Sequence, residues 1–336
     1  MTAGWRRRRA GSLGSTVDGL YRGILQRVPS AAERRSLAYQ VFRHGDIGAV
    51  SNDMITSDEF AIMRLPHLMA QASRQWCGKQ VFFLHVPKTA GTSMRLALTS
   101  SCGVPALTIY RHIGEIDRAE LHLVRFWPLF IGHAHIDFFP RQHRGLTVVR
   151  EPRSRYLSMY RQAQNEGRGP HLVDPEKRMR QQRISGRALS MPFGQWLRAG
   201  FTPSAASWFT EGFNSHPEKF VRAARPAEVR RAVASGVARI DAAAWSHDQV
   251  GMRTAITRMT GDEAPELHHE NAFSPRPETS AQVISSPDLA YLDECAARDQ
   301  VLIDALVARG LIEPLNSSQA DDLFHATAKR LGFQLA

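Results

Sequence analysis

The sequence contains no apolar run long enough to cross a membrane. None of its segments reaches the ~20 consecutive apolar residues that a transmembrane helix needs. The basic run Arg6–Arg9 is followed by Gly, Ser and Thr, so it does not have the form of a secretory signal. We therefore expect a cytoplasmic protein without a transmembrane segment, and we interpret residues 1–14 as a disordered basic tail.

Cysteine is also scarce. The chain has three cysteines, Cys77, Cys102 and Cys295, an odd number without CxxC spacing. Neither a disulfide framework nor a zinc site is indicated, and we expect a metal-free protein in a reducing compartment.

Acidic residues are outnumbered, 32 against 43 basic residues, which gives a net charge of +11. Such a surface attracts anionic partners: nucleic acid, a membrane surface, a charged small molecule or a polysaccharide. The other composition values, 43% hydrophobic and 22% charged residues, are those of a globular protein. A length of 336 residues favours one large α/β domain with a smaller appendage.

The first part of the chain has a helical pattern. Val17, Leu20, Tyr21 and Ile24 follow helical spacing, and Pro29-Ser30 mark the start of a second helix. We predict a small all-helical module over residues 15–70. The wording LYRGILQRVPS is similar to a short helical bacterial domain of unknown function that is distantly like phycobilisome linkers. An ordinary helical extension of the main domain is the alternative.

Residues 78–336 are predicted to form the main domain. Short apolar runs at 81–86 and 145–150 indicate buried strands, with a third at 129–133, and helices are expected at 94–99 and 152–164. Strands that alternate with helices predict a parallel sheet flanked by helices, with ligands beyond the strand carboxyl ends. We expect a surface excursion over 164–190, helices from residue 193, a loop over 261–287 and a final helix over 288–310.

The strongest functional signal is the loop Lys88–Ser93 between the first strand and its helix. Lys88, Thr89, Ala90, Gly91, Thr92 and Ser93 offer backbone N–H groups, hydroxyls and a cation to a phosphate-type anion, and Gly91 allows close approach of the backbone. An ordinary nucleoside triphosphate loop has the order GxxxxGK[ST], whereas here the lysine precedes the glycine.

The segment HVPKTAGTS resembles the 5′-phosphosulfate loop of sulfotransferases that use 3′-phosphoadenosine 5′-phosphosulfate (PAPS), particularly carbohydrate sulfotransferases similar to heparan sulfate 2-O-sulfotransferase. The resemblance covers about residues 81–161. It implies a P-loop-like sulfotransferase fold, PAPS as sulfuryl donor and a hydroxyl acceptor such as a carbohydrate. It also implies that Lys88 stabilises the leaving nucleotide, although ground-state binding alone is an alternative role.

A second matching element is LTVVREPRSRYLS, in which the family uses a strand-end arginine and a serine eight positions later to hold the nucleotide 3′-phosphate. These roles fall on Arg150 and Ser158. A guanidinium fork suits two phosphate oxygens, and the hydroxyl adds a donor. Taken alone, Arg150 would equally fit a surface strand end.

The third element is GHAHIDF, residues 132–138. In the related enzymes a histidine after glycine is the general base, and His133 takes that position, while Ile131 stands where those enzymes have another histidine. His133 thus has three interpretations: base, structural residue or metal ligand. His135 is interpreted as structural or supporting.

Two basic segments are weaker candidates. His268-His269-Glu270-Asn271 with Arg276 resembles a C-terminal loop near the nucleotide in related enzymes, and Arg276 is a candidate nucleotide contact. The run KRMRQQRISGR, 177–187, fits either an acceptor groove for an anionic glycan or a solvated loop.

Two other function classes compete with a sulfotransferase. An ATP-dependent phosphotransferase needs a magnesium site and the usual triphosphate loop, and neither is visible. A non-catalytic nucleotide- or nucleic-acid-binding protein fits the charge, but the aromatic residues are not interleaved with the cations. We therefore expect no specific nucleic-acid partner.

Overall fold

The computed structural model describes residues 13–44, 47–55, 57, 59–60, 64, 80–102, 107–109, 129–139, 141, 143–168, 186–200, 202–213, 216–267 and 282–336. The chain divides into two compact units: the described residues up to 64 belong to the first and those from 80 onward to the second. Among the described helices, none combines the length and the apolar character that crossing a bilayer requires. The two units are described separately.

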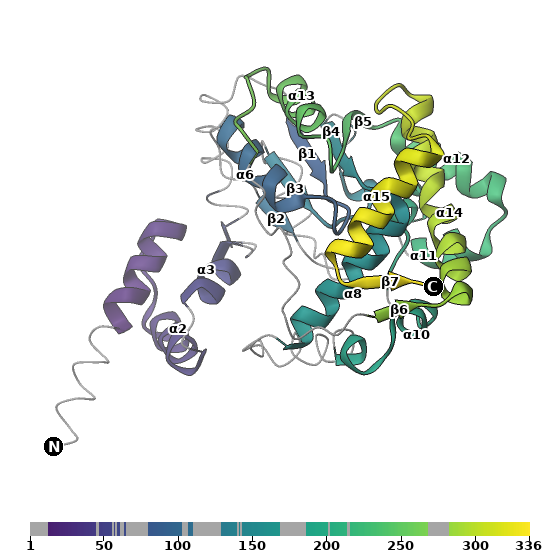
Figure 1. Cartoon of the computed structure of the whole chain (residues 1–336). Helices are drawn as coiled ribbons and strands as arrows, with labels where there is room; N and C mark the ends of the chain where they lie inside the picture. The colour runs from purple at the N-terminus through teal and green to yellow at the C-terminus, as the bar shows by residue number, and fades with distance from the viewer. Residues whose placement is uncertain are drawn as a thin grey trace. The chain divides into compact units, whose positions relative to one another are not determined.

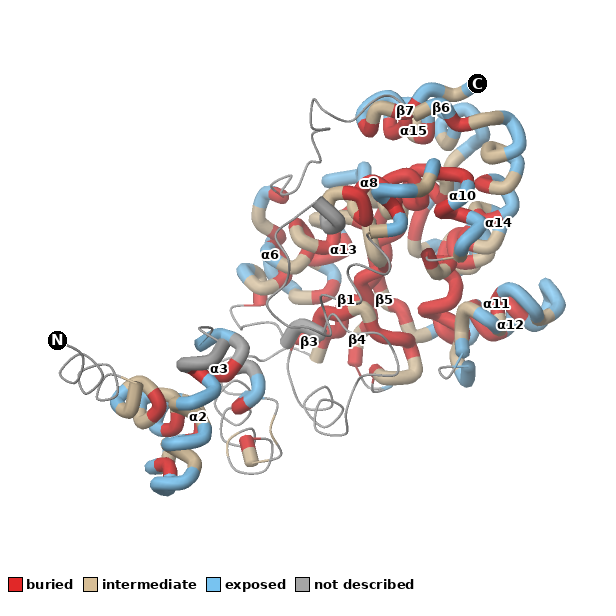
Figure 2. Tube along the Cα trace, turned by 90° about the horizontal axis from the view of Figure 1, so that it is seen from below, coloured by how far each residue is buried: buried red, intermediate tan, exposed pale blue. Residues whose placement is uncertain are grey.

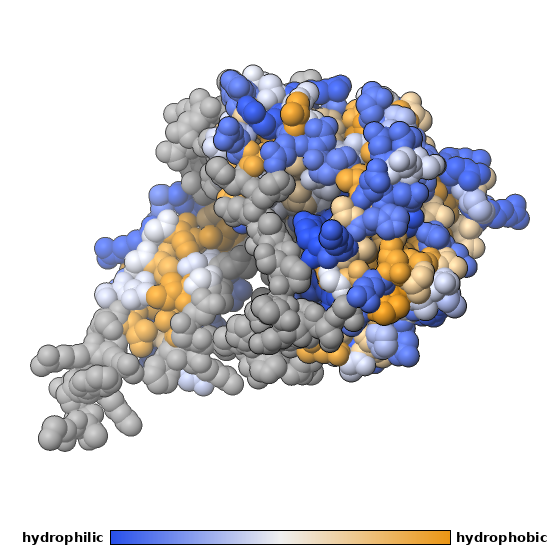
Figure 3. Space-filling model, in the orientation of Figure 1, coloured by the Kyte–Doolittle hydropathy of each residue, from blue (hydrophilic) through white to orange (hydrophobic). Residues whose placement is uncertain are grey.

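The N-terminal unit is helical, as predicted. Its first helix starts at residue 13 and continues as the π-helical turn η1 (Tyr21–Leu25), followed by α2 (Ala31–His44) and α3 (Ile47–Ile55). Ser30 and Glu33 form a capping box at the start of α2, in which each side chain accepts a hydrogen bond from the other residue's backbone N–H. The Arg27 guanidinium donates to the carboxylates of both Glu33 and Glu59, and so links the start of α2 to Glu59. Apolar side chains gather on this unit (Figure 3).

A five-stranded parallel sheet forms the centre of the second unit (Figure 1). The strand order is β2-β3-β1-β4-β5, with bounds β1 Val81–Leu84, β2 Leu107–Ile109, β3 Leu129–Gly132, β4 Arg144–Val149 and β5 Ile240–Trp245. Every residue of β1 and β3 is buried. Continuous apolar runs of this kind are typical of strands covered on both faces.

The strand order creates a topological switch beside β1. From β1 the chain continues to β2 and β3 on one side, whereas β4 and β5 lie on the other side of β1. In open parallel sheets, the crevice beyond the carboxyl ends of two such strands is the usual position of a ligand. A small cavity at this position is lined by Val86 and Thr89 from the loop after β1 and by Arg150 after β4.

Helices cover the sheet in two groups (Figure 2). The first group, α6 with α13, packs together beside β3, β4 and β5, and the second is built around α8 and α14. The helix bounds are α6 Gly91–Cys102, α8 Pro152–Arg168, α10 Phe193–Arg198, α11 Pro217–Ala223, α12 Pro226–Val237, α13 Gln249–Thr260, α14 Ser286–Ala308 and α15 Ser317–Arg330, with short turns η2 Ile136–Phe138 and η3 Ala205–Phe209. A small parallel pair, β6 (Gln282–Ile284) with β7 (Phe333–Leu335), completes the unit.

Four expectations for the later part of the chain are wrong. Residues 164–168 belong to α8, and residues 186–190 are helical, so these ends of the expected excursion are ordered structure. The segment 240–245 is strand β5 because burial between helices overrides the helical preference of its alanines. Residues 282–284 form β6 inside the expected loop, and α14 is not final, since α15 and β7 follow it.

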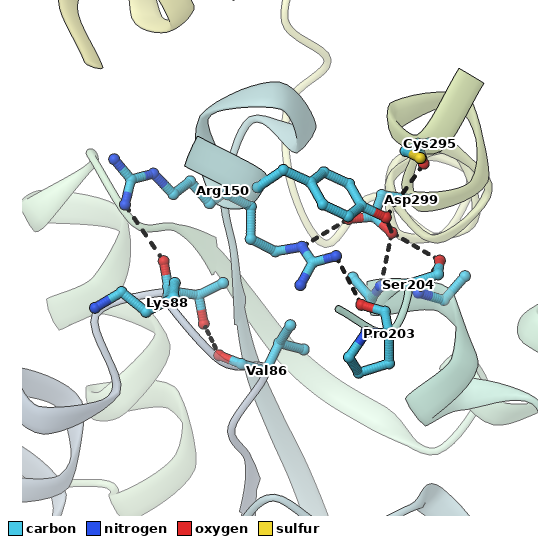
Figure 4. Close-up of polar contacts among 12 residues, drawn as sticks. Val86, Lys88, Arg150, Pro203, Ser204, Cys295 and Asp299 are labelled. Atoms are coloured by element: carbon cyan, nitrogen blue, oxygen red, sulfur yellow. Dashed lines mark hydrogen bonds and ion pairs between the residues drawn. The ribbon is translucent and has the colours of Figure 1, made fainter. Parts of the chain in front are cut away.

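A buried ion pair connects α8 and α14, the two main helices of the second group. Nε of Arg155, on α8, donates to Asp299, on α14, at 2.7 Å, and both side chains are at most 2% exposed. Asp299 also accepts from the Ser204 hydroxyl and the Ala205 backbone N–H at the start of η3 (Figure 4). The carboxylate thereby fixes η3 against both helices, and η3 carries Trp208 toward the sheet edge described below.

Replacing Asp299 by Ala should destabilise the protein by about 3–5 kcal/mol, because Arg155 would remain buried without its counter-charge. Urea unfolding of the variant measures this loss. The matched control is Arg141→Ala, which breaks an ion pair with Glu211 in which Arg141 is 78% exposed, and it should cost at most about 1 kcal/mol. Equal losses in the two variants would contradict the role given to Asp299.

Candidate functional site

The loop between β1 and α6 has an unusual backbone. Lys88 and Ala90 have φ angles of 72° and 61°, the left-handed region that residues with a Cβ rarely adopt. The Thr89 hydroxyl donates to the Val86 carbonyl at 2.7 Å and braces the turn. Two such residues within three positions are strained, and strain of this kind concentrates at ligand-binding sites. The loop ends where α6 begins, so the positive end of that helix faces the same region.

Gly91 has a steric role in this loop. A Cβ at Gly91 would lie 1.8 Å from Nε2 of His85, so only glycine leaves room for the imidazole. His85 follows β1 directly and is 8% exposed. Because Gly91 has no side chain, the His85 ring can pack directly against the first residue of α6.

His85 and His133 form a hydrogen-bonded pair at the edge of the sheet. Nδ1 of His85 lies 2.9 Å from Nε2 of His133. The register explains the pair, because Leu84 of β1 is opposite Gly132 of β3, and the His85 backbone N–H donates to the Gly132 carbonyl. The next residue of each strand must then lie beside the other. The His133 ring thus faces the residue that leads into the Lys88 loop.

His133 is neutral near pH 7. Burial lowers its pKa from 6.5 to about 4. The indole of Trp208, from η3, lies edge-on to its ring with centroids 6.2 Å apart. A neutral imidazole has one nitrogen lone pair, so the side chain is in the form that accepts a proton.

His135 has a structural position. Its side chain is fully buried, hydrogen-bonds to Thr210 at 3.2 Å and accepts from the backbone N–H of Asp137, which caps the turn η2. Within the part of the chain that the structure describes, no three His, Cys, Asp or Glu side chains come together as a metal site.

Arg150 joins the two predicted nucleotide-binding elements. It follows β4, and its guanidinium donates to the Ser158 hydroxyl at 3.0 Å. The same guanidinium donates to the Lys88 carbonyl at 3.4 Å (Figure 4). Strand-end arginine, α8 serine and lysine loop thus lie together at the switch point between β1 and β4.

The C-terminal helix α15 adds two residues to this cluster. The Thr327 hydroxyl accepts from Arg150 at 3.2 Å, and Arg330 is close enough for its charge to act on Arg150. Burial, and then the charge of Arg330, lower the pKa of Arg150 to about 10. Among the described residues no carboxylate forms an ion pair with Arg150, because neighbouring Glu151 instead caps α8 through the backbone N–H groups of Arg153 and Ser154. The charge of Glu151 acts on Arg150 without a hydrogen bond and opposes this lowering of the pKa. Among the described residues, the hydrogen-bond partners of the guanidinium are neutral oxygens.

Several candidates lie outside the described residues. These are His268, His269, Glu270, Asn271, Arg276, Cys77, the tail Arg6–Arg9 and residues 177–185 of the basic run. Arg187, at the end of that run, is exposed.

Sequence reasoning overlooked three residues of this cluster. His85 belongs to the quoted motif, and the signal for it is positional: it and His133 each lie at the carboxyl end of a predicted strand. Thr327 and Arg330 lie about 180 positions beyond Arg150 and carry no local signal.

His133, which is partly buried, and His135, which is fully buried, make stability depend on pH. Burial lowers the pKa of His133 and of His135 to about 4, whereas in the unfolded chain it is near 6.5. On acidification the unfolded state therefore takes up protons first, so the unfolding free energy should fall between about pH 6.5 and 4 by up to about 1.4 kcal/mol per pH unit for each histidine. Urea unfolding across this range measures the slope.

His135→Gln should reduce the dependence of the unfolding free energy on pH by the contribution of one histidine, up to about 1.4 kcal/mol per pH unit. The exposed His325 serves as the control, and His325→Gln should leave the slope unchanged. A slope that is the same in all three proteins would show that these histidines are not held neutral.

Comparison of the chain with protein-family models, with curated proteins and with solved structures found no match.

Proposed function

We propose that the protein is a sulfotransferase that moves a sulfuryl group from PAPS to a hydroxyl acceptor. The observation that carries the proposal is the position of Arg150, a half-buried cation that touches both Ser158 and the Lys88 loop and has only neutral oxygens as hydrogen-bond partners among the described residues. A cation held in this way, with Arg330 beside it, favours an anion at the same place.

The fit of the donor nucleotide to these residues can be argued from chemistry. Its 3′-phosphate requires a cation with several N–H donors and a neighbouring hydroxyl, which Arg150, Ser158 and Thr327 provide. The 5′-phosphosulfate requires a second cation and backbone donors, which the loop from Lys88 to Ser93 supplies at the start of α6. Within this proposal the sheet is the P-loop-like core of a sulfotransferase fold.

The chemical step divides between His133 and Lys88. The acceptor hydroxyl loses its proton to His133 as its oxygen bonds to sulfur, and the bond from sulfur to the bridging phosphate oxygen breaks. Lys88 stabilises the negative charge that this oxygen gains. Because a nearby negative charge favours the protonated imidazole, the bound anion raises the pKa of His133 from about 4 toward the working pH.

The acceptor is proposed to be a carbohydrate. The family resemblance favours a sugar hydroxyl, and the net charge of +11 suits an anionic glycan. Incubation with radiolabelled PAPS and a panel of glycans tests the acceptor class.

Arg150→Met should weaken binding of the desulfated nucleotide PAP by about 1.5–3 kcal/mol, which is about a 10- to 150-fold higher Kd. Titration calorimetry with PAP, ATP and DNA measures the effect and compares the three function classes. Tight PAP binding supports a sulfotransferase, preference for ATP supports a phosphotransferase, and salt-sensitive DNA binding supports a nucleic-acid-binding protein.

The stability of Arg150→Met separates binding from folding. Since the variant removes a poorly compensated cation, its unfolding free energy should stay within about 1 kcal/mol of wild type. The exposed Arg141→Ala variant is the control and should bind PAP as wild type does. Unchanged PAP affinity in Arg150→Met would refute the assigned 3′-phosphate site.

His133→Ala should lower turnover by about 10²–10⁴ while PAP affinity stays nearly intact, because the imidazole acts on the acceptor proton and not on the nucleotide. Lys88→Ala should lower both turnover and PAP affinity, because the Lys88 ammonium binds the donor and also stabilises the leaving group. Measuring kcat and the PAP Kd for both variants tests this division. Full turnover in His133→Ala would show that the base is another group.

A further inference from the structure

We infer that His85 is the positioning residue for the base His133: its Nδ1 accepts a hydrogen bond from Nε2–H of His133 and so holds the tautomer in which Nδ1 of His133 carries the lone pair. The catalytic meaning of this inference rests on the proposed function. The contact between Nε2 of His133 and Nδ1 of His85 rests on the geometry of the two rings, and its direction, from His133 to His85, is part of the inference.

One proton lies in the hydrogen bond between the two rings, so one ring donates and the other accepts. Nδ1 of His85 and Nε2 of His133 are 2.9 Å apart, and the ring planes meet at 68° with centroids 4.4 Å apart. A hydrogen bond between two neutral imidazoles needs an N–H on one side and a lone pair on the other. The nitrogen of His133 that bonds to His85 is therefore engaged, and the acceptor's proton must go to its other nitrogen, Nδ1. That nitrogen carries a lone pair only when Nε2 holds the proton.

His85 is held firmly enough to impose this arrangement. Its ring stacks on Phe83 with centroids 5.5 Å apart and planes 18° apart, and it fills the space above Gly91. Its backbone N–H continues the sheet by donating to the Gly132 carbonyl at 2.9 Å. Packing on both sides leaves the imidazole little freedom to turn away from His133.

The surroundings of His85 keep it neutral, which an acceptor at Nδ1 requires. It is buried, and the titratable or charged groups of the described residues that act on its pKa are His133, Lys88 of the loop and Arg95 of α6. Burial, and then these positive or potentially positive groups, hold its pKa well below 6.5. A protonated His85 would have N–H on both nitrogens and would lose its acceptor. Burial first, and then the charges of Lys88 and Arg95, therefore keep His85 neutral.

His85→Leu should lower kcat by at least about 10-fold, because His133 would then also populate the tautomer whose Nδ1 carries a proton, with little change in the PAP Kd. His85→Asn should recover much of the loss, because its amide oxygen lies near the position of Nδ1. The matched control is His143→Leu, a buried histidine that precedes β4 at the opposite edge of the sheet. This control should lower stability without a selective loss of kcat.

The tautomer of His133 gives a readout that does not depend on activity. NMR of protein with ¹⁵N-labelled histidine should show His133 with its proton on Nε2 throughout the neutral pH range, and a mixture of both tautomers in His85→Leu. A proton on Nδ1 in the wild-type protein would overturn the inference, as would an unaltered tautomer in His85→Leu together with wild-type kcat. Failure of the wild-type protein to bind PAP would instead overturn the proposed function, and the NMR comparison would still decide whether His85 holds His133.

Discussion

The parallel pairing of β1 with both β3 and β4 determines where every described candidate side chain lies. Leu84 is opposite Gly132 on one side and Thr147 on the other, and the Thr147 hydroxyl donates to the Leu84 carbonyl. Three neighbouring strands therefore end at one edge, where His85, His133 and Arg150 follow them. A slip of one residue in either register would turn alternate side chains to the other face and separate these groups.

Two arginines five positions apart show how the fold separates structure from recognition. Arg155 is buried and forms an ion pair with Asp299. This pair holds α8 against α14, and Asp299 also binds the start of η3. Arg150 is held in place by Ser158, Thr327 and the Lys88 carbonyl, none of which carries a negative charge. The first arginine stabilises the scaffold, whereas the second lacks such a hydrogen-bonded counter-charge among the described residues, which is why we propose it as the anion-binding group. The scaffold network also places Trp208 beside His133, so the two functions are physically connected.

The sequence was sufficient where local patterns decide the structure. Apolar runs identified β1, β3 and β4, and the spacing of Arg150 and Ser158 brought a strand end and a helix turn together as expected. It was insufficient where tertiary context decides, because the alanines of β5 favour a helix until neighbouring elements bury them. The His85–His133 pair depends on a register that no local signal specifies, and Thr327 reaches Arg150 from the far end of the chain.

The central claim is that an anionic nucleotide binds at the carboxyl edge of β1 and β4. A crystal structure of the protein with PAP tests it most directly. The account predicts the 3′-phosphate within hydrogen-bond distance of Arg150 and Ser158, with the 5′-phosphate against the loop from Lys88 to Ser93. A nucleotide bound elsewhere on the sheet, or at this edge with its adenine in place of the 3′-phosphate, would contradict it.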